Sequence, residues 1–242
     1  MKRRYVIALT MLVVIGFASV AQAEIKIGML AQRGPDIALK EWGGIGDYLT
    51  QRMGDKVTIV PLAFTEVLEF SRNEPSAFIF VNSGFYVRAK VLRGAKALVT
   101  AKYKGSGASF GGVIFARRDS GISTIDDLRH KILMCVKFSS AGGWLFQKGV
   151  LVEDGLIPEK DCAKLVEGKT HDAVVYAVMN KKADAGTVRT NILESMQREG
   201  KINMNDFVII HPVKHPDFPE VCSTPLYPDW PLASLKKTSP EV

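Results

Sequence analysis

Residues 131–155, KILMCVKFSSAGGWLFQKGVLVEDG, decide how the chain can fold, because a strand pattern, a polar loop and a helix pattern follow one another within them. The apolar run ILMCVKF is typical of a buried strand, and the amphipathic stretch LFQKGVLVEDG indicates a helix over about 143–153. The loop between them, SSAGG at 139–143, holds two hydroxyl residues and two glycines. A strand that passes through a short polar loop into a helix is a basic unit of α/β folds.

The same alternation of strand and helix patterns runs through most of the chain. EIKIGML is followed by DIALKEWGGIGDYLTQRM, KVTIVPL by TEVLEFSR, and AFIFVN by FYVRAKVL. After the glycine-bearing GSGASFGG the alternation begins again with VIFARR and continues to FVII at residue 210. Such alternation is typical of β-α units around a largely parallel sheet. We therefore predict an α/β protein with two lobes.

The lobe boundaries follow from the place where the two runs meet. The runs join near residue 112, so we assign residues 24–111 to the first lobe and 112–211 to the second. Seven of the eleven prolines stand in residues 212–242, which excludes a mostly helical segment there. We predict that this segment returns to the first lobe as extended chain. Residues 238–241 look like a helix start, so the tail is either frayed or the beginning of a helix that a longer protein would continue.

The first 23 residues have the pattern of a secretory signal. A basic start, KRR at residues 2–4, precedes an apolar run over residues 5–20, and AQA at 21–23 fits a cleavage site. We predict cleavage after Ala23 and a periplasmic location. An uncleaved membrane anchor is the alternative, although the apolar run is shorter than the roughly 20 residues that a span needs.

Charge and cysteine content narrow the class of protein. The formal charge of the 242 residues is +7, and it falls to +4 without the signal segment, which holds three basic and no acidic residues. The basic residues are scattered rather than clustered with aromatics, so we predict no nucleic-acid partner. A mild excess of positive charge is compatible with a small anionic ligand. The three cysteines, Cys135, Cys162 and Cys222, are too few for a disulfide framework, and the sequence does not choose a pair among them.

Polar and glycine residues gather in five loops where a predicted strand meets a predicted helix. In open parallel sheets, ligands bind beyond the carboxyl ends of the strands. Unpaired backbone N–H groups and the helix dipole attract an anion there, hydroxyls add donors, and glycines allow a close approach. The five loops are Gln32–Asp36, Asn82–Tyr86, Ser139–Gly143, Gly168–Asp172 and Thr187–Thr190.

Nine residues of these loops are our candidates for binding a ligand. Each has a structural alternative: serine and threonine cap ordinary helices, a histidine beside a cap can be structural, and arginines can be solvated charges. The sequence does not show the direction of the Asp172 carboxylate. If the carboxylate faces the cleft, it favours a ligand that carries a proton or an amine. If it only caps its helix, a sulfur oxyanion can also bind. The candidates are Arg33, Ser83, Tyr86, Ser139, Ser140, His171, Asp172, Thr187 and Arg189.

The sequence gives weaker support to a metal site and to a hydrolase active site. His211 and His215 are each followed by a proline, which excludes the helical i, i+4 geometry of two metal-binding histidines, so we expect no metal. An exported hydrolase could use Ser139 or Ser140 with His171 and an acid, but the chain has no G-x-S-x-G motif. We therefore expect a binding protein without catalytic residues or a cofactor.

Six passages, spread over nearly the whole chain after residue 23, resemble the phosphonate/phosphate-type periplasmic solute-binding proteins of ABC transporters. The last two passages look similar to the branch that serves as the exported input domain of sensor histidine kinases, including tetrathionate sensors. The six are IKIGMLAQRGPDIALKEW, FVNSGFYVRAK, SFGGVIFARRDSGISTIDDLRHK, FSSAGGW, GKTHDAVVYAVMNKKADAGTVRT and STPLYPDWPLA.

The resemblance implies a type II periplasmic binding protein, in which two α/β lobes joined by a hinge close on a small oxyanion. Tyr86 matches the family's cleft tyrosine, Ser139 and Ser140 its hydroxyl-rich anion loop, and His171 the histidine at the head of the next helix. The loop reads SSAGGW where phosphonate binders have a Ser-Thr-Ser-Gly type.

Two functions follow from the resemblance. In the first, a monomer binds a phosphonate, phosphite or phosphate and presents it to an inner-membrane ABC permease. In the second, the chain is the input domain of a two-component sensor kinase that recognises a sulfur oxyanion such as tetrathionate.

Overall fold

The computed structural model describes residues 24–74 and 77–238. The predicted signal segment, residues 1–23, and most of the predicted helix start at 238–241 lie outside the described residues. The strands are β1 (Ile25–Leu30), β2 (Val57–Leu62), β3 (Phe78–Phe80), β4 (Lys96–Thr100), β5 (Ser109–Phe110), β6 (Gly112–Arg117), β7 (Ile132–Cys135), β8 (Lys164–Glu167), β9 (Ala185–Arg189), β10 (Phe207–Ile210), β11 (Tyr227–Pro228) and β12 (Pro231–Ser234). The helices are α1 (Pro35–Met53), α2 (Val67–Asn73), α3 (Ser83–Arg93), α4 (Phe146–Glu153), α5 (Pro158–Asp161), α6 (His171–Met179) and α7 (Ile192–Arg198), with a π-helical turn η3 (Ala141–Leu145) and 3-10 turns η1 (Arg118–Ser120), η2 (Asp126–Leu128) and η4 (Met204–Asp206).

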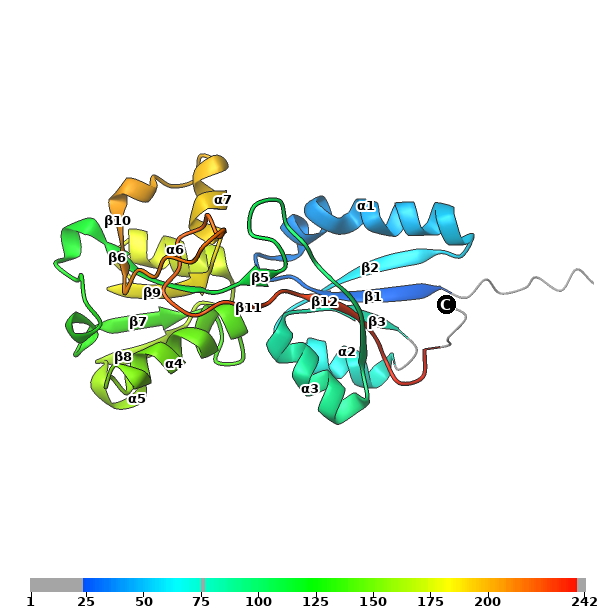
Figure 1. Cartoon of the computed structure of the whole chain (residues 1–242), viewed down its shortest axis with the longest axis horizontal. Coiled ribbons are helices and arrows are strands. Elements are labelled where there is room, and N and C mark those ends of the chain that lie inside the picture. The colour runs from blue at the N-terminus through cyan, green and yellow to red at the C-terminus, as the bar shows by residue number, and fades with distance from the viewer. Residues whose placement is uncertain (1–23, 75–76, 239–242) are drawn as a thin grey trace, which may run out of the picture.

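The strands form two five-stranded sheets, each covered by helices on both faces (Figure 1). The first sheet has the order β2-β1-β3-β12-β4, with α1 on one face and α2 and α3 on the other. The second has the order β10-β6-β9-β7-β8, with α6 and α7 on one face and α4 and α5 on the other. The predicted α/β fold with two lobes is confirmed. We call the parts around the first and second sheets lobe 1 and lobe 2.

Both sheets are mixed rather than largely parallel. In the first, β1 runs parallel to β2 and β3, whereas β12 is antiparallel to β3 and β4. In the second, β7 is parallel to β8 and β9, whereas β6 is antiparallel to β9 and β10. The antiparallel strands are those that enter a sheet from a chain crossing between the lobes, which the strand-helix alternation alone does not reveal.

Two crossings connect the lobes, and they pair with each other. The first crossing carries β5 and the returning one carries β11, and these form an antiparallel ladder in which Phe110 faces Tyr227. The Tyr227 ring stacks on Phe146 of lobe 2, with centroids 3.7 Å apart. The crossings therefore form a short paired hinge between the two sheets.

The returning crossing first follows lobe 2 before it reaches lobe 1. Ser223 donates its backbone N–H to Gly112 O (2.8 Å) and its hydroxyl to Ile210 O (2.7 Å). Only at β12 does the segment join the first sheet. The lobe boundaries proposed from the sequence remain predictions, and these hydrogen bonds favour counting residues 213–224 with lobe 2.

One apolar cluster runs from the first sheet into the second. Ile79 and Phe85 of lobe 1 belong to the same buried cluster as Phe110, Val136 and Ala141. A second buried cluster lies within lobe 2. The lobes are thus in direct apolar contact.

Two further observations concern the described ranges as a whole. None of the helices within them has the length and apolarity that a membrane span requires. Cys135, Cys162 and Cys222 are all unpaired, and Cys135 and Cys222 are buried.

Candidate functional site

The loop after β1 reaches across to the start of α6 in lobe 2. Gly34 adopts a positive φ of 108°, which favours glycine, and Pro35 begins α1, where its missing N–H costs nothing. This turn places Gln32 and Arg33 at the end of the first sheet. The backbone N–H of His171 donates to Gln32 O at 3.1 Å, so the β1–α1 loop is hydrogen-bonded to the other lobe.

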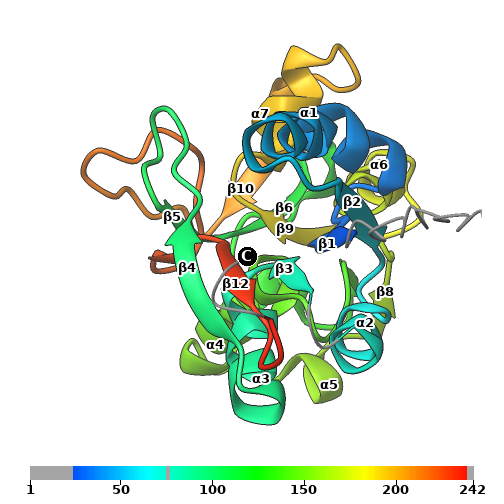
Figure 2. The same cartoon turned by 90° about the vertical axis from the view of Figure 1, so that its right-hand side faces the viewer.

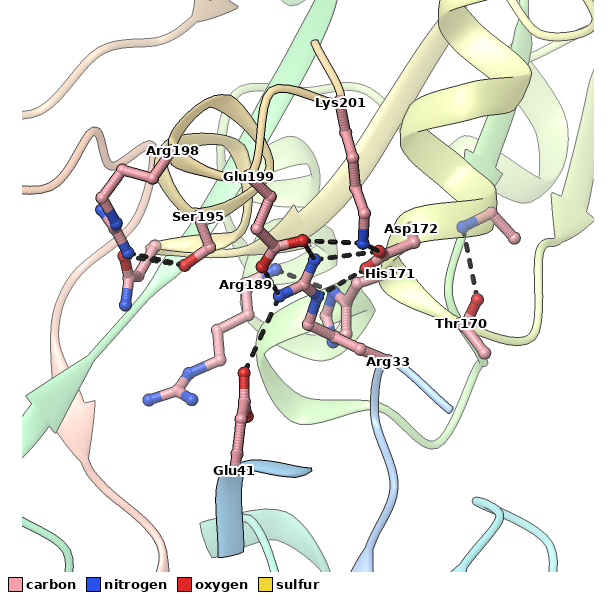
Figure 3. A network of polar contacts seen from close by, with 12 residues as sticks. Arg33, Glu41, Thr170, His171, Asp172, Arg189, Ser195, Arg198, Glu199 and Lys201 are labelled. Carbon is pink, nitrogen blue, oxygen red and sulfur yellow. Dashed lines mark hydrogen bonds and ion pairs between the residues drawn. The ribbon is translucent and has the colours of Figure 1, made fainter. Parts of the chain in front are cut away.

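Arg33 is the centre of an ion-pair cluster between the lobes (Figure 3). Its Nε and Nη2 donate to the carboxylate of Asp172 at 2.6 and 2.9 Å, and its Nη1 and Nη2 donate to that of Glu199 at 2.7 and 2.9 Å. Lys201 Nζ lies 2.7 Å from Glu199 Oε2 and 3.5 Å from Asp172 Oδ2. The direction of the Asp172 carboxylate, left open by the sequence, is therefore toward Arg33.

These contacts favour a bridging role for Arg33 and Asp172, and their role as ligand-binding residues stays a prediction. All three guanidinium nitrogens already donate to carboxylates. Burial acts to lower the pKa of Arg33, but the hydrogen bonds that it donates to Glu199 and Asp172 raise the pKa above its ordinary value. The hydrogen bond from Arg33 lowers the pKa of Glu199 to about 2. Arg33 and Glu199 are thus both ionised at neutral pH.

His171 is buried at the start of α6. Thr170 caps this helix, because its hydroxyl accepts a hydrogen bond from the N–H of Ala173 at 3.2 Å. The ring nitrogen Nδ1 accepts the backbone N–H of Arg189 at 3.2 Å, which leaves the proton of the neutral ring on Nε2. Burial, with the charges of Arg189 and Arg33, lowers the pKa of His171 to about 3. The ring is therefore neutral and a weak base.

The hydroxyls of the Ser139–Gly143 loop are used within lobe 2. Ser140 Oγ accepts the N–H of Gly143 at 3.2 Å, and Thr187 Oγ1 donates to Gly143 O at 2.6 Å. The backbone N–H of Leu145 reaches Ser140 O at 2.9 Å, which makes the first turn π-helical. Ser139 is half-buried, whereas Ser140 and Thr187 are buried.

The two glycines of this loop are explained by packing, and a role of its backbone N–H groups in binding an anion stays a prediction. Both are buried. A Cβ on Gly142 would lie 2.7 Å from the ring of Phe110, and one on Gly143 would lie 2.6 Å from Cγ2 of Val136. Because side chains fill the space beside the loop, its backbone is covered in this structure.

Ser83 and Tyr86 lie on α3, whose start abuts η3 of lobe 2. Asn82 caps α3, with its Oδ1 accepting the N–H of Phe85 at 3.0 Å. The Tyr86 hydroxyl accepts the N–H of Ala97 at 3.3 Å, and Ser83 is half-buried. A Cβ on Gly84 would lie 3.3 Å from Cβ of Ala141. The roles of Ser83, Tyr86, Ser139 and Ser140 toward a ligand stay predictions.

A cavity of about 300 Å³ lies between the lobes. Its wall in lobe 1 is the β1–α1 loop and α1, its wall in lobe 2 is the end of β9 and α7, and the two crossings contribute one aromatic residue each. Among its lining residues are Arg33, Trp42, Tyr103, Arg189, Arg198 and Trp230.

Arg189 is the most strongly positioned of these residues. Its side chain lies apart from the Arg33 ion pairs in Figure 3, and its Nη2 donates to both carboxylate oxygens of Asp229 at 2.8 and 3.0 Å. Aromatic rings surround the guanidinium: its Cζ lies 4.7 Å from the ring centroid of Phe110, 5.5 Å from Tyr103 and 5.7 Å from Trp230. Cation–π contacts of this kind hold an arginine in place within an apolar wall.

Two buried donors of this wall have no acceptor. Within the described ranges, Arg189 Nε and Trp230 Nε1 make no hydrogen bond, although both atoms are buried. A buried donor without an acceptor costs about 1–3 kcal/mol, so such groups usually face a ligand or an ordered water.

Arg198 adds a second positive charge at the mouth of the cavity. It is exposed and donates to Asn191 Oδ1 (3.1 Å) and Ser195 Oγ (2.8 Å). No carboxylate of the described residues pairs with it. Glu41, the one acidic residue among those that line the cavity, lies 3.9 Å from Arg33 Nη1. Of the three arginines that line the cavity, Arg33 and Arg189 are paired with carboxylates, and Arg198 has no carboxylate partner among the described residues.

Sequence reasoning named Arg33 and Arg189 but missed the aromatic, acidic and basic residues that complete this wall. The missed residues are Trp42, Tyr103, Arg198, Asp229 and Trp230. As for a metal, no group of three or more histidine, cysteine or acidic residues within the described ranges is arranged to hold one.

Comparisons with known proteins bear on this site. The sequence profile described as "ABC transporter, phosphonate, periplasmic substrate-binding protein" matches residues 27–242. The tetrathionate sensor histidine kinase TtrS of Salmonella typhimurium is 33% identical over 218 residues, which are 88% of this chain and 37% of that protein. The chain therefore spans little more than a third of the length of this curated relative.

Solved structures show the same fold. A binding protein component of an ABC phosphonate transporter from Pseudomonas aeruginosa superposes with a TM-score of 0.73 at 16% identity, covering 91% of this chain and 71% of that one. PhnD1 from Prochlorococcus marinus, in complex with methylphosphonate, gives a TM-score of 0.75 at 15% identity, covering 88% and 77%. Together with arginine-binding relatives from T. maritima, these identify the two-lobed architecture as that of type II periplasmic binding proteins.

Proposed function

The chain belongs to the family of periplasmic substrate-binding proteins of phosphonate ABC transporters, and on that premise we propose that it closes its lobes on a small oxyanion of the phosphonate, phosphite or phosphate class. In this proposal it is exported by residues 1–23 to the periplasm, works as a monomer and presents its ligand to an inner-membrane permease. The ligand stabilises the closed arrangement by binding it more tightly than the open one.

The observation that carries the proposal is the pair of buried, unaccepted donors at the interlobe cavity, Arg189 Nε and Trp230 Nε1. Both residues line a cavity of about 300 Å³, which is the lower end of the size range of small-molecule sites. An oxyanion there would gain charge-assisted hydrogen bonds, which are stronger than neutral ones. His171 Nδ1 accepts the backbone N–H of Arg189 and so helps to position this arginine.

The site geometry supports binding rather than catalysis. The hydrolase reading needs a histidine that acts as a base and an acid that orients it. Here the pKa of His171 is lowered to about 3 by burial, and its Nδ1 already accepts a backbone N–H. Asp172 is paired with Arg33 instead.

A second candidate function is the input domain of a sensor kinase that recognises a sulfur oxyanion such as tetrathionate. Its support is the 33% identity to a tetrathionate sensor histidine kinase and the second cation at the cavity, Arg198, which has no carboxylate partner among the described residues. Two separate positive charges on an aromatic wall suit an elongated dianion.

Thermal unfolding in the presence of candidate anions tests both functions. The panel is phosphate, phosphite, methylphosphonate, aminoethylphosphonate, sulfate, thiosulfate and tetrathionate. A ligand at 100 times its dissociation constant stabilises the folded protein by about 2.7 kcal/mol. A phosphorus ligand that raises the melting temperature supports uptake, and a sulfur oxyanion that does so supports the sensor.

Two variants test whether the anion stabilises the protein by binding in the cavity. Arg189→Gln should abolish the stabilisation by the anion, whereas Arg52→Gln, an exposed arginine on α1 outside the cavity, should retain it. A cooperative melt that no anion shifts would contradict the oxyanion assignment. Equal stabilisation of the Arg189→Gln variant would place the ligand elsewhere.

A further inference from the structure

A groove larger than the interlobe cavity lies on lobe 1. It has a volume of about 1170 Å³ and is lined by the C-terminal half of α3, by β4, by the end of β12 and by residues 235–238. Figure 2 shows α3, β4 and β12 side by side on this part of the molecule. The groove shares no lining residue with the interlobe cavity, so it is not part of the site described above.

The rim of the groove is basic and unneutralised. None of its described lining residues is acidic, and six are basic. No carboxylate of the described residues forms an ion pair with any of the six. They are Arg72, Lys90, Arg93, Lys96, Lys236 and Lys237.

One of these cations has a buried atom that lacks an acceptor. Arg93 is half-buried, and its Nε makes no hydrogen bond within the described ranges. Lys90 and Arg93 lie in the last turn of α3, where the helix dipole already favours a cation. The dipole explains the charge but not the missing acceptor, which a carboxylate could supply.

The floor and sides of the groove are apolar and exposed. Val91, Leu92 and Leu98 keep 77%, 56% and 55% of their surface accessible. All five residues of β4 are exposed, and β4 pairs with β12 on one side only, so it is an edge strand. Soluble proteins rarely leave an apolar patch beside an unprotected strand edge, and such patches mark interaction sites.

We propose that this groove is the docking site for an acidic, amphipathic segment of a partner protein. Apolar side chains of the segment would cover Val91, Leu92 and Leu98, and its carboxylates would pair with the basic rim. A concave surface with an apolar floor accepts a helix or strand. The groove is concave and has a volume of about 1170 Å³, whereas a membrane surface is flat, so the groove shape favours the peptide. The proposal is independent of the oxyanion function.

The test is binding of designed peptides to the full exported chain, followed by fluorescence anisotropy. The acidic probe is an amphipathic 20-residue peptide with leucines on one face and glutamates on the other, and its counterpart has lysines in place of the glutamates. We expect only the acidic probe to bind, with an affinity that falls as salt is raised. The double variant Lys90→Glu/Lys96→Glu should weaken binding by at least about tenfold, a change of about 1.4 kcal/mol.

A matched control separates local docking from overall charge. Lys160→Glu/Lys164→Glu makes the same charge change at exposed positions of lobe 2 outside the groove and should leave the affinity unchanged. Leu98→Ser should also weaken binding, because the floor contributes as well as the rim. Circular dichroism and the unfolding transition show that each variant is folded.

Three outcomes would overturn the proposal. They are no binding of the acidic probe, equal weakening by the groove and control variants, and binding to phosphatidylglycerol vesicles without binding to the peptide. The last result would identify the basic rim as a membrane contact.

Discussion

Arg33 and Asp172 form a two-pronged ion pair across the lobes, with Nε–Oδ1 and Nη2–Oδ2 distances of 2.6 and 2.9 Å. Arg33 follows the first strand of lobe 1, and Asp172 lies in the first turn of α6 in lobe 2. Opening of the cleft must separate the two groups and return both charges to water. Under the proposed function, the pair therefore biases the protein toward the closed arrangement, and the oxyanion adds to that bias.

The first prediction concerns this bias. Asp172→Asn should destabilise the closed form by about 1.5–3 kcal/mol, the usual contribution of a hydrogen bond to a charged group. Small-angle scattering of the unliganded variant should show a larger radius of gyration, and its affinity for the oxyanion should fall because binding must also close the cleft. Asp154→Asn, an exposed position without an ion pair among the described residues, is the control. If the radius of gyration and the affinity of Asp172→Asn are unchanged, the Arg33–Asp172 pair does not hold the lobes together.

The second prediction concerns pH. The pKa of His171 is lowered from 6.5 to about 3 by burial and by the charges of Arg189 and Arg33. Below about pH 6.5, His171 therefore binds a proton in the unfolded chain but not in the folded protein. Stability is full above this pH and falls as the pH drops, by up to about 1.4 kcal/mol per pH unit.

The His171→Gln variant isolates this effect. Its free energy of unfolding in urea should depend less on pH between about pH 7 and pH 5 than that of the native protein. Burial raises the pKa of the Glu194 and Glu220 carboxyls, which acts in the opposite direction but is common to both proteins. Parallel pH profiles for the two proteins would show that His171 titrates normally.

The third prediction concerns the loop before α4. Gly143→Ala would place a Cβ 2.6 Å from Val136 Cγ2 and 2.7 Å from Ser140 Oγ, so overpacking should cost about 1–3 kcal/mol. Gly149→Ala, in the exposed interior of the following helix, meets nothing within 4 Å and should stabilise by roughly 0.5–1 kcal/mol. Chemical denaturation measures the free energy of unfolding, which should fall for Gly143→Ala and rise for Gly149→Ala. A tolerated Gly143→Ala would mean that the loop has room for an anion after all.

The strand and helix order was predictable from the sequence because apolar runs and amphipathic runs alternate with little ambiguity. The helix predicted over about 143–153 is α4, Phe146–Glu153, preceded by the π-helical turn, and the predicted strand FVII is β10. The antiparallel strands were not predictable in the same way. β12 joins the first sheet from a proline-rich segment that gives no strand periodicity over more than a few residues.

The candidate site was predictable in part for the same reason. Residues at strand ends, such as Arg189 and His171, follow from the rule that ligands bind there. Trp42 stands within an amphipathic helix, and Trp230 lies between two prolines in the returning segment, so nothing local marks either as part of a cavity. Their meeting at Arg189 depends on how the two crossings bring the lobes together, which is a property of tertiary structure.

The fourth prediction tests how Asp229 controls the charge of Arg189, and it rests on the proposed function. The Asp229 side chain is fully buried and accepts from Arg189 Nη2 at 2.8 and 3.0 Å, so it cancels much of the field that an anion in the cavity would feel. Asp229→Asn removes that charge while keeping an oxygen that can accept the hydrogen bond. Affinity for the oxyanion should rise by about tenfold, or about 1.4 kcal/mol, although the loss of a buried ion pair should lower the free energy of unfolding by about 3–5 kcal/mol.

Calorimetric titration of Asp229→Asn beside Asp172→Asn provides the comparison, because the two variants remove the same charge and should change affinity in opposite directions. Asp172 holds the lobes together and its loss weakens binding, whereas Asp229 opposes the anion and its loss strengthens binding. Weaker binding in a folded Asp229→Asn variant would show instead that the carboxylate is needed to orient the guanidinium among Phe110, Tyr103 and Trp230. In that case the orienting effect of Asp229 on Arg189 would outweigh its neutralising effect on the charge of Arg189.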